Sequence, residues 1–200
     1  EDGIRDYKVT GVQTCALPIL DAPPEKEDCV PFVTIDEFFD KHGVRVPHIV
    51  AKDLDQGLLL LEDFGDVVLS TLLNDTTVDE YYAQSFKQLI ELQQIDAKEY
   101  LPEYSYDKLM SEMRLLTDWM LPSLNIQPSE QQLETIEQAF DFLAVEATQQ
   151  PQVIVHRDFH SRNLMKIENE QELGVIDFQD AVIGAEDRKS TRLNSSHLVI

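Results

Sequence analysis

The spacing of apolar residues predicts a small mixed region at residues 20–66. Three apolar residues share one helical face: Ile35, Phe38 and Phe39. They indicate a short helix that ends at Gly43, because glycine is common just after the last turn of a helix. Two apolar runs follow at 49–54 and 57–61, with the close spacing of a β-hairpin. The polar residues 62–66 interrupt this pattern, so we predict a helix, two strands and a hinge in that order.

The next region, residues 67–150, has helical periodicity. Two capping boxes, Thr77-x-x-Glu80 and Ser129-x-x-Gln132, predict helix starts. Three apolar stripes at helical spacing predict three helices, of which Pro122 ends the second. The stripes consist of Tyr82, Phe86, Leu89 and Ile90, of Leu109, Met113, Leu116 and Met120, and of Leu133, Ile136, Phe140 and Leu143. We assign all three stripes to the core of a helical bundle.

The period changes after Pro151. Short apolar runs at 153–155, 164–167 and 174–176 predict buried strands. The polar residues 168–172 have the length and composition of a turn that joins the last two strands into a hairpin. The whole pattern predicts an α+β protein whose helical middle lies between two regions that contain strands.

The polar residues beside these strands carry the candidate chemistry. The segment 156–163 reads His-Arg-Asp-Phe-His-Ser-Arg-Asn, and Asp177-Phe178 follows the last predicted strand. A tight loop can bring Asp158 and Asn163 together, and the hairpin returns Asp177 to the same place. Two carboxylates and one amide oxygen are hard ligands that suit magnesium better than zinc. The sequence therefore predicts a magnesium site.

Magnesium beside a free carboxylate is the arrangement that phosphoryl transfer requires. The spacing H-R-D-x-x-x-x-N, with Asp-Phe beginning 19 residues after Asp158, is the signature of the kinase catalytic loop and metal-binding segment. We assign His156 to structural support of that loop. The i,i+4 spacing of His156 and His160 does not indicate a zinc protease, because no Glu follows His156 and the segment is a loop.

Composition narrows the range of functions. The chain has 200 residues, 42% of them hydrophobic, and a formal net charge of −22, which argues against non-specific binding to nucleic acid or to an anionic membrane. Its apolar run 58–61 is far too short to span a membrane, and two cysteines are too few for a disulfide framework. We expect a cytoplasmic protein, and the oligomeric state is open. The seven scattered glycines form neither GxGxxG nor GxxxxGK[ST].

Residues 154–163 and 174–184 resemble the aminoglycoside phosphotransferase branch of the protein-kinase-like superfamily, in which Asp-Phe is not followed by the kinase glycine. Here Gln179 takes that place. More narrowly, D-A-P-P-E-K-E-D-C at 21–29, the H-R-D-F-H-S-R-N loop and D-F-Q-D-A at 177–181 resemble bacterial cell-wall amino-sugar kinases. Those enzymes phosphorylate the anomeric hydroxyl of N-acetylmuramate and N-acetylglucosamine during peptidoglycan recycling.

This resemblance implies an ATP- and Mg²⁺-dependent kinase acting on a small sugar. It implies a protein-kinase-like α+β fold with a partial N-lobe and hinge at 20–66, and a partial helical C-lobe with a catalytic β-hairpin at 67–186. The alternative substrates are an aminoglycoside or a choline-like alcohol. An alternative of another class is a non-catalytic kinase-like module that binds a partner through its acidic surface.

The resemblance also implies roles for individual residues. Asp158 would be the catalytic base, and Asn163 and Asp177 the magnesium ligands. Backbone groups of the hinge would contact adenine, and four side chains are candidates for sugar contacts. The hinge is Glu62-Asp63-Phe64, and the sugar candidates are His160, Arg162, Asp180 and Glu112. Glu37 would either pair with the nucleotide lysine or face solvent, and Trp119 would pack in the core rather than stack on a sugar.

The two ends of the chain differ from the rest. Residues 1–19 lack periodicity and residues 187–200 are locally basic and rich in Ser and Asn, and both resemble translated sequencing adapters. We expect both segments to be non-native. The family begins with a glycine-rich hairpin and continues beyond the equivalent of Gly184. The resemblance therefore implies an internal piece of a larger kinase, which we expect to be nearly inactive because phosphoryl transfer depends on complete positioning of the phosphates.

Overall fold

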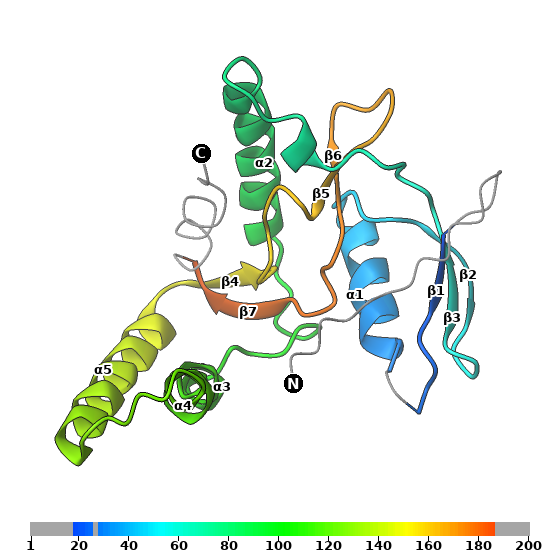
Figure 1. Ribbon diagram of the computed structural model, residues 1–200. Helices are drawn as coiled ribbons and strands as arrows, with labels where there is room; N and C mark the ends of the chain where they lie inside the picture. Colours follow the sequence, from blue (N-terminus) through cyan, green and yellow to red (C-terminus); the bar gives the residue numbers. More distant parts are fainter. Residues whose placement is uncertain (1–17, 26–27, 187–200) are drawn as a thin grey trace.

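The hinge predicted at residues 62–66 separates a small sheet with one helix from a larger, mostly helical part (Figure 1). The computed structural model describes residues 18–25 and 28–186. The first part contains β1 (Ile19–Asp21), α1 (Val30–Lys41), β2 (Ile49–Asp53) and β3 (Leu58–Leu61). The strand order is β1-β3-β2, and both neighbouring pairs are antiparallel. The predicted helix and hairpin are confirmed, and residues 62–66 lie in no helix or strand, while their role as a hinge stays a prediction.

The larger part begins after the hinge and contains two short antiparallel strand pairs, β4–β7 and β5–β6. Its elements are η1 (Leu69–Thr71), α2 (Val78–Gln93), α3 (Tyr106–Met113), the π-helical turn η2 (Leu116–Met120), α4 (Leu121–Ser123), α5 (Glu130–Gln149), β4 (Gln152–Val155), β5 (Leu164–Lys166), β6 (Leu173–Val175) and β7 (Val182–Ala185). The three predicted strands are present. Strand β7 was not predicted, although its apolar sequence fits a buried strand.

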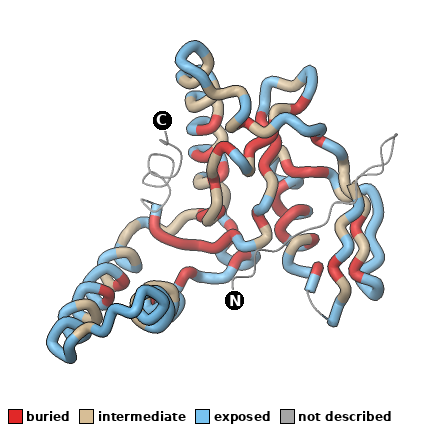
Figure 2. The backbone as a smooth tube through the Cα atoms, in the orientation of Figure 1, coloured by how far each residue is buried: buried red, intermediate tan, exposed pale blue. Residues whose placement is uncertain are grey.

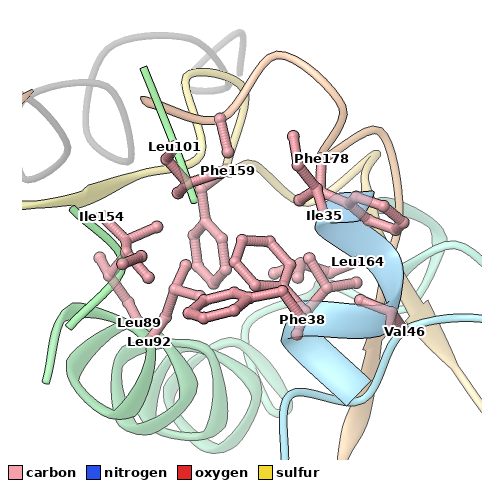
Figure 3. Packing of buried hydrophobic residues seen from close by; sticks show 14 of the residues in the cluster. Ile35, Phe38, Val46, Leu89, Leu92, Leu101, Ile154, Phe159, Leu164 and Phe178 are labelled. Carbon is pink, nitrogen blue, oxygen red and sulfur yellow. The ribbon is translucent and has the colours of Figure 1, made fainter. Parts of the chain in front are cut away.

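One hydrophobic cluster joins α1, α2 and the strand-rich segment. Phe39 of α1 and Leu92 of α2 are buried against Phe159 and Phe178, the residues that directly follow the two candidate site aspartates. Figure 3 shows Phe159 and Phe178 directed into this cluster together with Phe38. Burying such a side chain stabilises the fold by about 1.5–3 kcal/mol. The apolar residue after each aspartate therefore anchors a polar loop to the core.

The helical region is less buried than its sequence pattern predicts. Helices α3, α4 and α5 extend from the rest of the described chain, and much of their surface is exposed (Figures 1 and 2). A small cluster of Met110, Phe140 and Ala144 holds α3 against α5. Several stripe residues and Trp119 are instead exposed: Phe86, Ile90, Met120, Leu133 and Leu143. Their assignment to the bundle core, and that of Trp119, is wrong.

The two predicted capping boxes have different outcomes. The Ser129 hydroxyl accepts a hydrogen bond from the Gln132 amide, and the Gln132 side chain accepts one from the Ser129 amide at 2.8 Å, which confirms the box at α5. Thr77 precedes α2 without capping it, because its hydroxyl donates to the Leu72 carbonyl at 2.6 Å. Helix periodicity continues through Pro122, which lies in the first turn of α4, where proline is tolerated.

The α+β class is confirmed, whereas the domain boundaries stay predictions. Strand β1 begins at Ile19, the last residue of the segment 1–19 that we expect to be non-native. Cys15 and the segment 187–200 lie outside the described residues. No helix in the described part of the chain is long and apolar enough to cross a membrane.

Candidate active site

His156, the first residue after β4, anchors the following loop to the interior of the protein. This histidine is fully buried, and its Nε2 lies 3.0 Å from the carbonyl oxygen of Ile176, beside the second candidate aspartate. The next residue, Arg157, has a positive φ of 72°, a conformation that costs energy for a residue other than glycine. The structural role predicted for His156 is confirmed, and it joins the two loops of the site.

The β5–β6 hairpin brings the predicted metal ligands together. Leu164 pairs with Val175, and the Ile176 amide donates to the Asn163 carbonyl at 3.1 Å, so the pairing extends one residue beyond the strands. The next side chains therefore meet, and Asn163 Nδ2 lies 2.8 Å from Asp177 Oδ2. The same amide nitrogen donates to the Asp158 backbone carbonyl at 3.0 Å. One amide group thus connects all three candidate residues.

The oxygens at this point suit a hard cation. Asp177 is exposed, its Oδ1 accepts a hydrogen bond from Gln179 Nε2 at 2.9 Å, and its φ is 63°. The described residues contain no group of three or more His, Cys, Asp or Glu side chains that could hold a metal. The carboxylate of Asp177 and the side-chain oxygen of Asn163 are oxygen ligands of the type that magnesium accepts when water and phosphate complete its shell. The donor set fits Mg²⁺.

A cleft of about 930 Å³ lies between the small sheet and these loops. Its walls include the hinge residues 62–66 and the side chains of Asp158, Asn163 and Asp177. Leu20 of β1 and Phe32 of α1 contribute from the small sheet and its helix. The volume is in the range of pockets that hold a nucleotide-sized ligand. The structure therefore places the hinge and the polar cluster on the same cleft.

The hinge presents backbone groups rather than free side chains. Within the described residues, the backbone N–H and C=O groups of Asp63 and Phe64 form no hydrogen bond with other backbone groups. The Asp63 carboxylate accepts from the Gly65 amide at 2.8 Å, and the Phe64 ring is buried against Met165 and Ile167. Glu62 is bound to Arg45. On the wall of a cleft, such N–H groups can donate hydrogen bonds to a heterocyclic ring, and such C=O groups can accept hydrogen bonds from it.

Arg45 is a residue of this region that the sequence analysis missed. It precedes β2, and its guanidinium binds Glu62 at 2.6 Å and Glu170 at 2.9 Å. Hydrogen bonds from Arg45 are the main reason that the pKa values of both carboxyl groups lie below the usual value of 4.5. The sequence shows an excess of acidic residues, but this excess does not indicate which carboxylates bind Arg45.

The candidates for sugar contacts are not gathered in one place. Asp180 lines the cleft, whereas His160, Arg162 and Glu112 are not among its lining residues. Glu112 accepts a hydrogen bond from Arg157 Nη2 at 2.7 Å and another from the Tyr104 hydroxyl, so this residue of α3 supports the loop after β4. Their roles in sugar binding stay predictions.

Glu37 faces solvent, the second of the two alternatives. Its side chain is 59% exposed and forms an ion pair of 2.5 Å with Lys52 of β2. An ion pair this exposed contributes little to stability, about 0–1 kcal/mol.

Comparison with known proteins identifies the family. A sequence profile described as the phosphotransferase enzyme family matches residues 7–186. The chain belongs to this family. The match begins inside the segment 1–19, whose non-native origin stays a prediction. The resemblance drawn from the H-R-D-x-x-x-x-N loop and the Asp-Phe segment is confirmed at the level of the family.

Two curated relatives of this chain carry the same name. An N-acetylmuramate/N-acetylglucosamine kinase of Pseudomonas aeruginosa is 39% identical over 170 residues, which cover 84% of this chain and 50% of that protein. A protein of the same name from Neisseria meningitidis is 31% identical over 185 residues, 90% of this chain and 54% of that protein. The chain thus spans about half the length of the curated relatives it matches.

Solved structures confirm the kinase-like fold of the chain. An ADP-bound aminoglycoside phosphotransferase has a TM-score of 0.59 at 21% identity, over 84% of this chain and 60% of that one. A choline/ethanolamine kinase family protein from Mesorhizobium loti has a TM-score of 0.58 at 11% identity, over 86% and 55% of the two chains. At such identities the likeness concerns the fold alone.

The contact between the hinge and β6 gives a testable prediction. A Cβ atom at Gly174 would lie 2.3 Å from Cε2 of the Phe64 ring, so Gly174→Ala must displace this ring. We expect a loss of about 1–3 kcal/mol in the free energy of unfolding, measured in urea. The control is Gly184→Ala in β7, where the nearest atom, Tyr104 Cβ, lies at 3.2 Å. A control as damaging as Gly174→Ala would contradict the prediction.

Proposed function

We propose that this chain is the nucleotide-binding and catalytic part of an ATP- and Mg²⁺-dependent kinase that phosphorylates the anomeric hydroxyl of N-acetylmuramate or N-acetylglucosamine. The observation that carries the proposal is the meeting of Asp158, Asn163 and Asp177 on one cleft with the hinge. The names of the curated relatives support the choice of sugar. A cytoplasmic location is part of the proposal.

Asp158 acts as the general base in this proposal. It lines the cleft and lies between Arg157, which has a positive φ, and Phe159, whose burial anchors the loop to the core. The carboxylate orients the acceptor hydroxyl and takes its proton as the hydroxyl oxygen bonds to the γ-phosphorus, while the bond from that phosphorus to the bridging oxygen breaks and ADP leaves. Positioning of this kind supplies most of the rate enhancement in phosphoryl transfer, because the reaction needs no covalent enzyme intermediate.

Asn163 and Asp177 would hold magnesium. The hydrogen bond from the Asn163 amide fixes the Asp177 carboxylate, and Gln179 fixes its other oxygen. A bound magnesium ion neutralises charge on the phosphate oxygens of the nucleotide. The backbone groups of Asp63 and Phe64 would contact adenine, and the apolar side chains of Leu20, Phe32 and Ile176 would enclose the base within the cleft.

Asp180 is the best placed of the candidate sugar ligands, because it alone of the four lines the cleft. A carboxylate can accept hydrogen bonds from two neighbouring sugar hydroxyls. We include His160, Arg162 and Glu112 as further sugar-contacting candidates, although Glu112 already binds Arg157. The aminoglycoside and choline-like alternatives remain outcomes of the test.

The test measures ATP binding by this chain and phosphate transfer by a full-length relative, because we expect the chain itself to be nearly inactive. Isothermal titration with ATP, with and without MgCl₂, should give binding that depends on magnesium. ³¹P NMR should then detect a sugar phosphate with N-acetylmuramate or N-acetylglucosamine as acceptor, and none with kanamycin or choline. We expect Asp158→Asn in this chain to retain ATP binding, and the equivalent change in the full-length relative to lower the transfer rate at least about a hundredfold, in line with the loss of a general base.

Each result decides a part of the proposal. No binding of ATP contradicts the kinase assignment. Phosphorylation of kanamycin or choline in place of the amino sugars contradicts the substrate. Binding of Mg·ATP by this chain, with no transfer by the full-length relative to any of the four acceptors, contradicts catalysis and favours the non-catalytic module.

A further inference from the structure

Arg45 connects three segments that are far apart in the sequence. It lies before β2, while Glu62 begins the hinge after β3 and Glu170 lies in the turn between β5 and β6. The Arg45 backbone also takes part, because its carbonyl accepts a hydrogen bond from the Val175 amide of β6 at 2.8 Å. One residue thus bridges the small sheet, the hinge and the hairpin that carries Asn163 and Asp177.

The guanidinium of Arg45 donates five hydrogen bonds. Nη1 and Nη2 donate to the two carboxylate oxygens of Glu62 at 2.8 and 2.6 Å. Nε and Nη2 donate to the two oxygens of Glu170, both at 2.9 Å, and Nη1 also donates to the Val46 carbonyl at 3.2 Å. These five bonds equal the five N–H groups of an arginine. A lysine could not form two such bidentate pairs.

The Arg45 guanidinium also contacts the hinge through the ring of Phe64. The Arg45 Cζ lies 4.6 Å from the centroid of the Phe64 ring, a cation–π distance. Glu62 is in turn fixed by two bonds with His48, one from the His48 amide to its carboxylate at 3.1 Å and one from its own amide to the His48 carbonyl at 2.8 Å. The residues on both sides of Asp63 are therefore held by Arg45.

We propose that Arg45 is a positioning residue that sets the hinge backbone at the distance from the β5–β6 hairpin that an adenine nucleotide requires. The inference rests on the proposed nucleotide site and adds to it the group that fixes the spacing of its two walls. Arg45 does not line the cleft, so it acts through Glu62, Phe64 and Glu170 rather than by touching the nucleotide.

The experiment compares two probes of the same cleft. ATP uses the hinge and the polar cluster, whereas tripolyphosphate with MgCl₂ uses the polar cluster alone. We expect Arg45→Met to raise the Kd of ATP about tenfold or more, equal to about 1.4 kcal/mol or more of binding free energy, and to leave the Kd of Mg·tripolyphosphate within about twofold. Arg45→Lys should recover only a small part of the ATP affinity, because it keeps the charge and loses both bidentate pairs.

A matched control removes another ion-paired arginine. Arg114 binds Glu137 of α5 on the exposed helical region and takes no part in the cleft, so Arg114→Met should leave both Kd values unchanged. Hydrogen exchange without nucleotide gives a second measurement. The amides of Glu62 and Val175 should exchange faster in Arg45→Met than in Arg114→Met, while the α2 amides keep their rates.

The outcomes separate this inference from the proposed function. Equal losses for both probes, or faster exchange throughout the chain, would make Arg45 a residue of general stability and overturn the inference. Unchanged ATP affinity in Arg45→Met would also overturn it. Full recovery by Arg45→Lys would show that charge alone suffices and would overturn the bidentate mechanism. A wild-type chain that binds neither probe contradicts the proposed function itself.

Discussion

Asp177→Asn is expected to abolish most of the magnesium-dependent binding of ATP. The substitution keeps the size of the side chain. It also keeps one oxygen that can accept the hydrogen bond from Asn163 Nδ2, which lies 2.8 Å from Asp177 Oδ2 in the wild type. It removes the negative charge that attracts the cation and replaces a carboxylate oxygen with an amide nitrogen that cannot bind a metal. Loss of groups that only support metal ligands costs 10- to 100-fold, so a ligand itself should cost at least about a hundredfold in affinity.

The measurement is a titration of ATP into the variant at several concentrations of MgCl₂. The control is Asp75→Asn, which makes the same change of charge on the exposed loop before α2. Asp177 is itself exposed, so the urea midpoint of Asp177→Asn should stay close to that of the control. Wild-type affinity in Asp177→Asn would rule out the metal site that the oxygens of Asn163 and Asp177 suggest.

The arrangement around Asp177 could be predicted because it depends on short-range connections. The strand runs 164–167 and 174–176 are separated by only six residues, 168–173, and strands this close in the sequence pair most readily as a hairpin. Pairing of Leu164 with Val175 then fixes where Asn163 and Asp177 lie. The residues after Asp158 and Asp177 are both phenylalanines, and their burial determines which way each loop turns.

The Arg45 contacts could not be predicted in the same way. Arg45 and Glu170 are separated by 125 residues, and the chain offers many acidic side chains as alternative partners. Which carboxylate an arginine binds is decided by the packing of the whole fold. The role of Glu112 was missed for the same reason, since its partner Arg157 lies 45 residues away.

Helical periodicity predicted where helices form but not which faces are covered. In α5 the stripe predicted as core splits, because Phe140 is buried while Leu143 is 54% exposed. An amphipathic pattern shows only that a face is apolar, and burial of that face depends on what packs against it. The β4–β7 pairing was not predicted. Residues 182–185 form a short apolar run, and their partner strand β4 lies before the whole 156–180 segment, so no local signal indicates the pairing.

A buried carboxylic acid on α1 is expected to make the free energy of unfolding depend strongly on pH. Asp36 is 2% exposed, and its Oδ2 has no hydrogen-bond partner among the described residues. Burial, with smaller contributions from Asp40 and Glu37, raises the pKa of Asp36 from 3.8 to about 7.

The raised pKa makes stability fall as pH rises. Below pH 3.8 the carboxyl is protonated in both the folded and the unfolded chain, and it costs nothing. Between pH 3.8 and about 7 the unfolded chain loses its proton while the folded chain keeps it, so the free energy of unfolding decreases with pH. Above pH 7 the full cost of about 4 kcal/mol is present.

Asp36→Asn is therefore expected to be more stable than the wild type, and by an amount that grows with pH. Urea unfolding at pH 5.5 and pH 8 should show the advantage of the variant increasing by about 2 kcal/mol, because the amide has no proton to lose. Asp40→Asn is the control, since Asp40 is exposed and lies 3.6 Å from His48, and its effect should stay within about 1 kcal/mol. If the difference between Asp36→Asn and the wild type is the same at both pH values, Asp36 is ionised in the folded chain and the buried site has a partner for it.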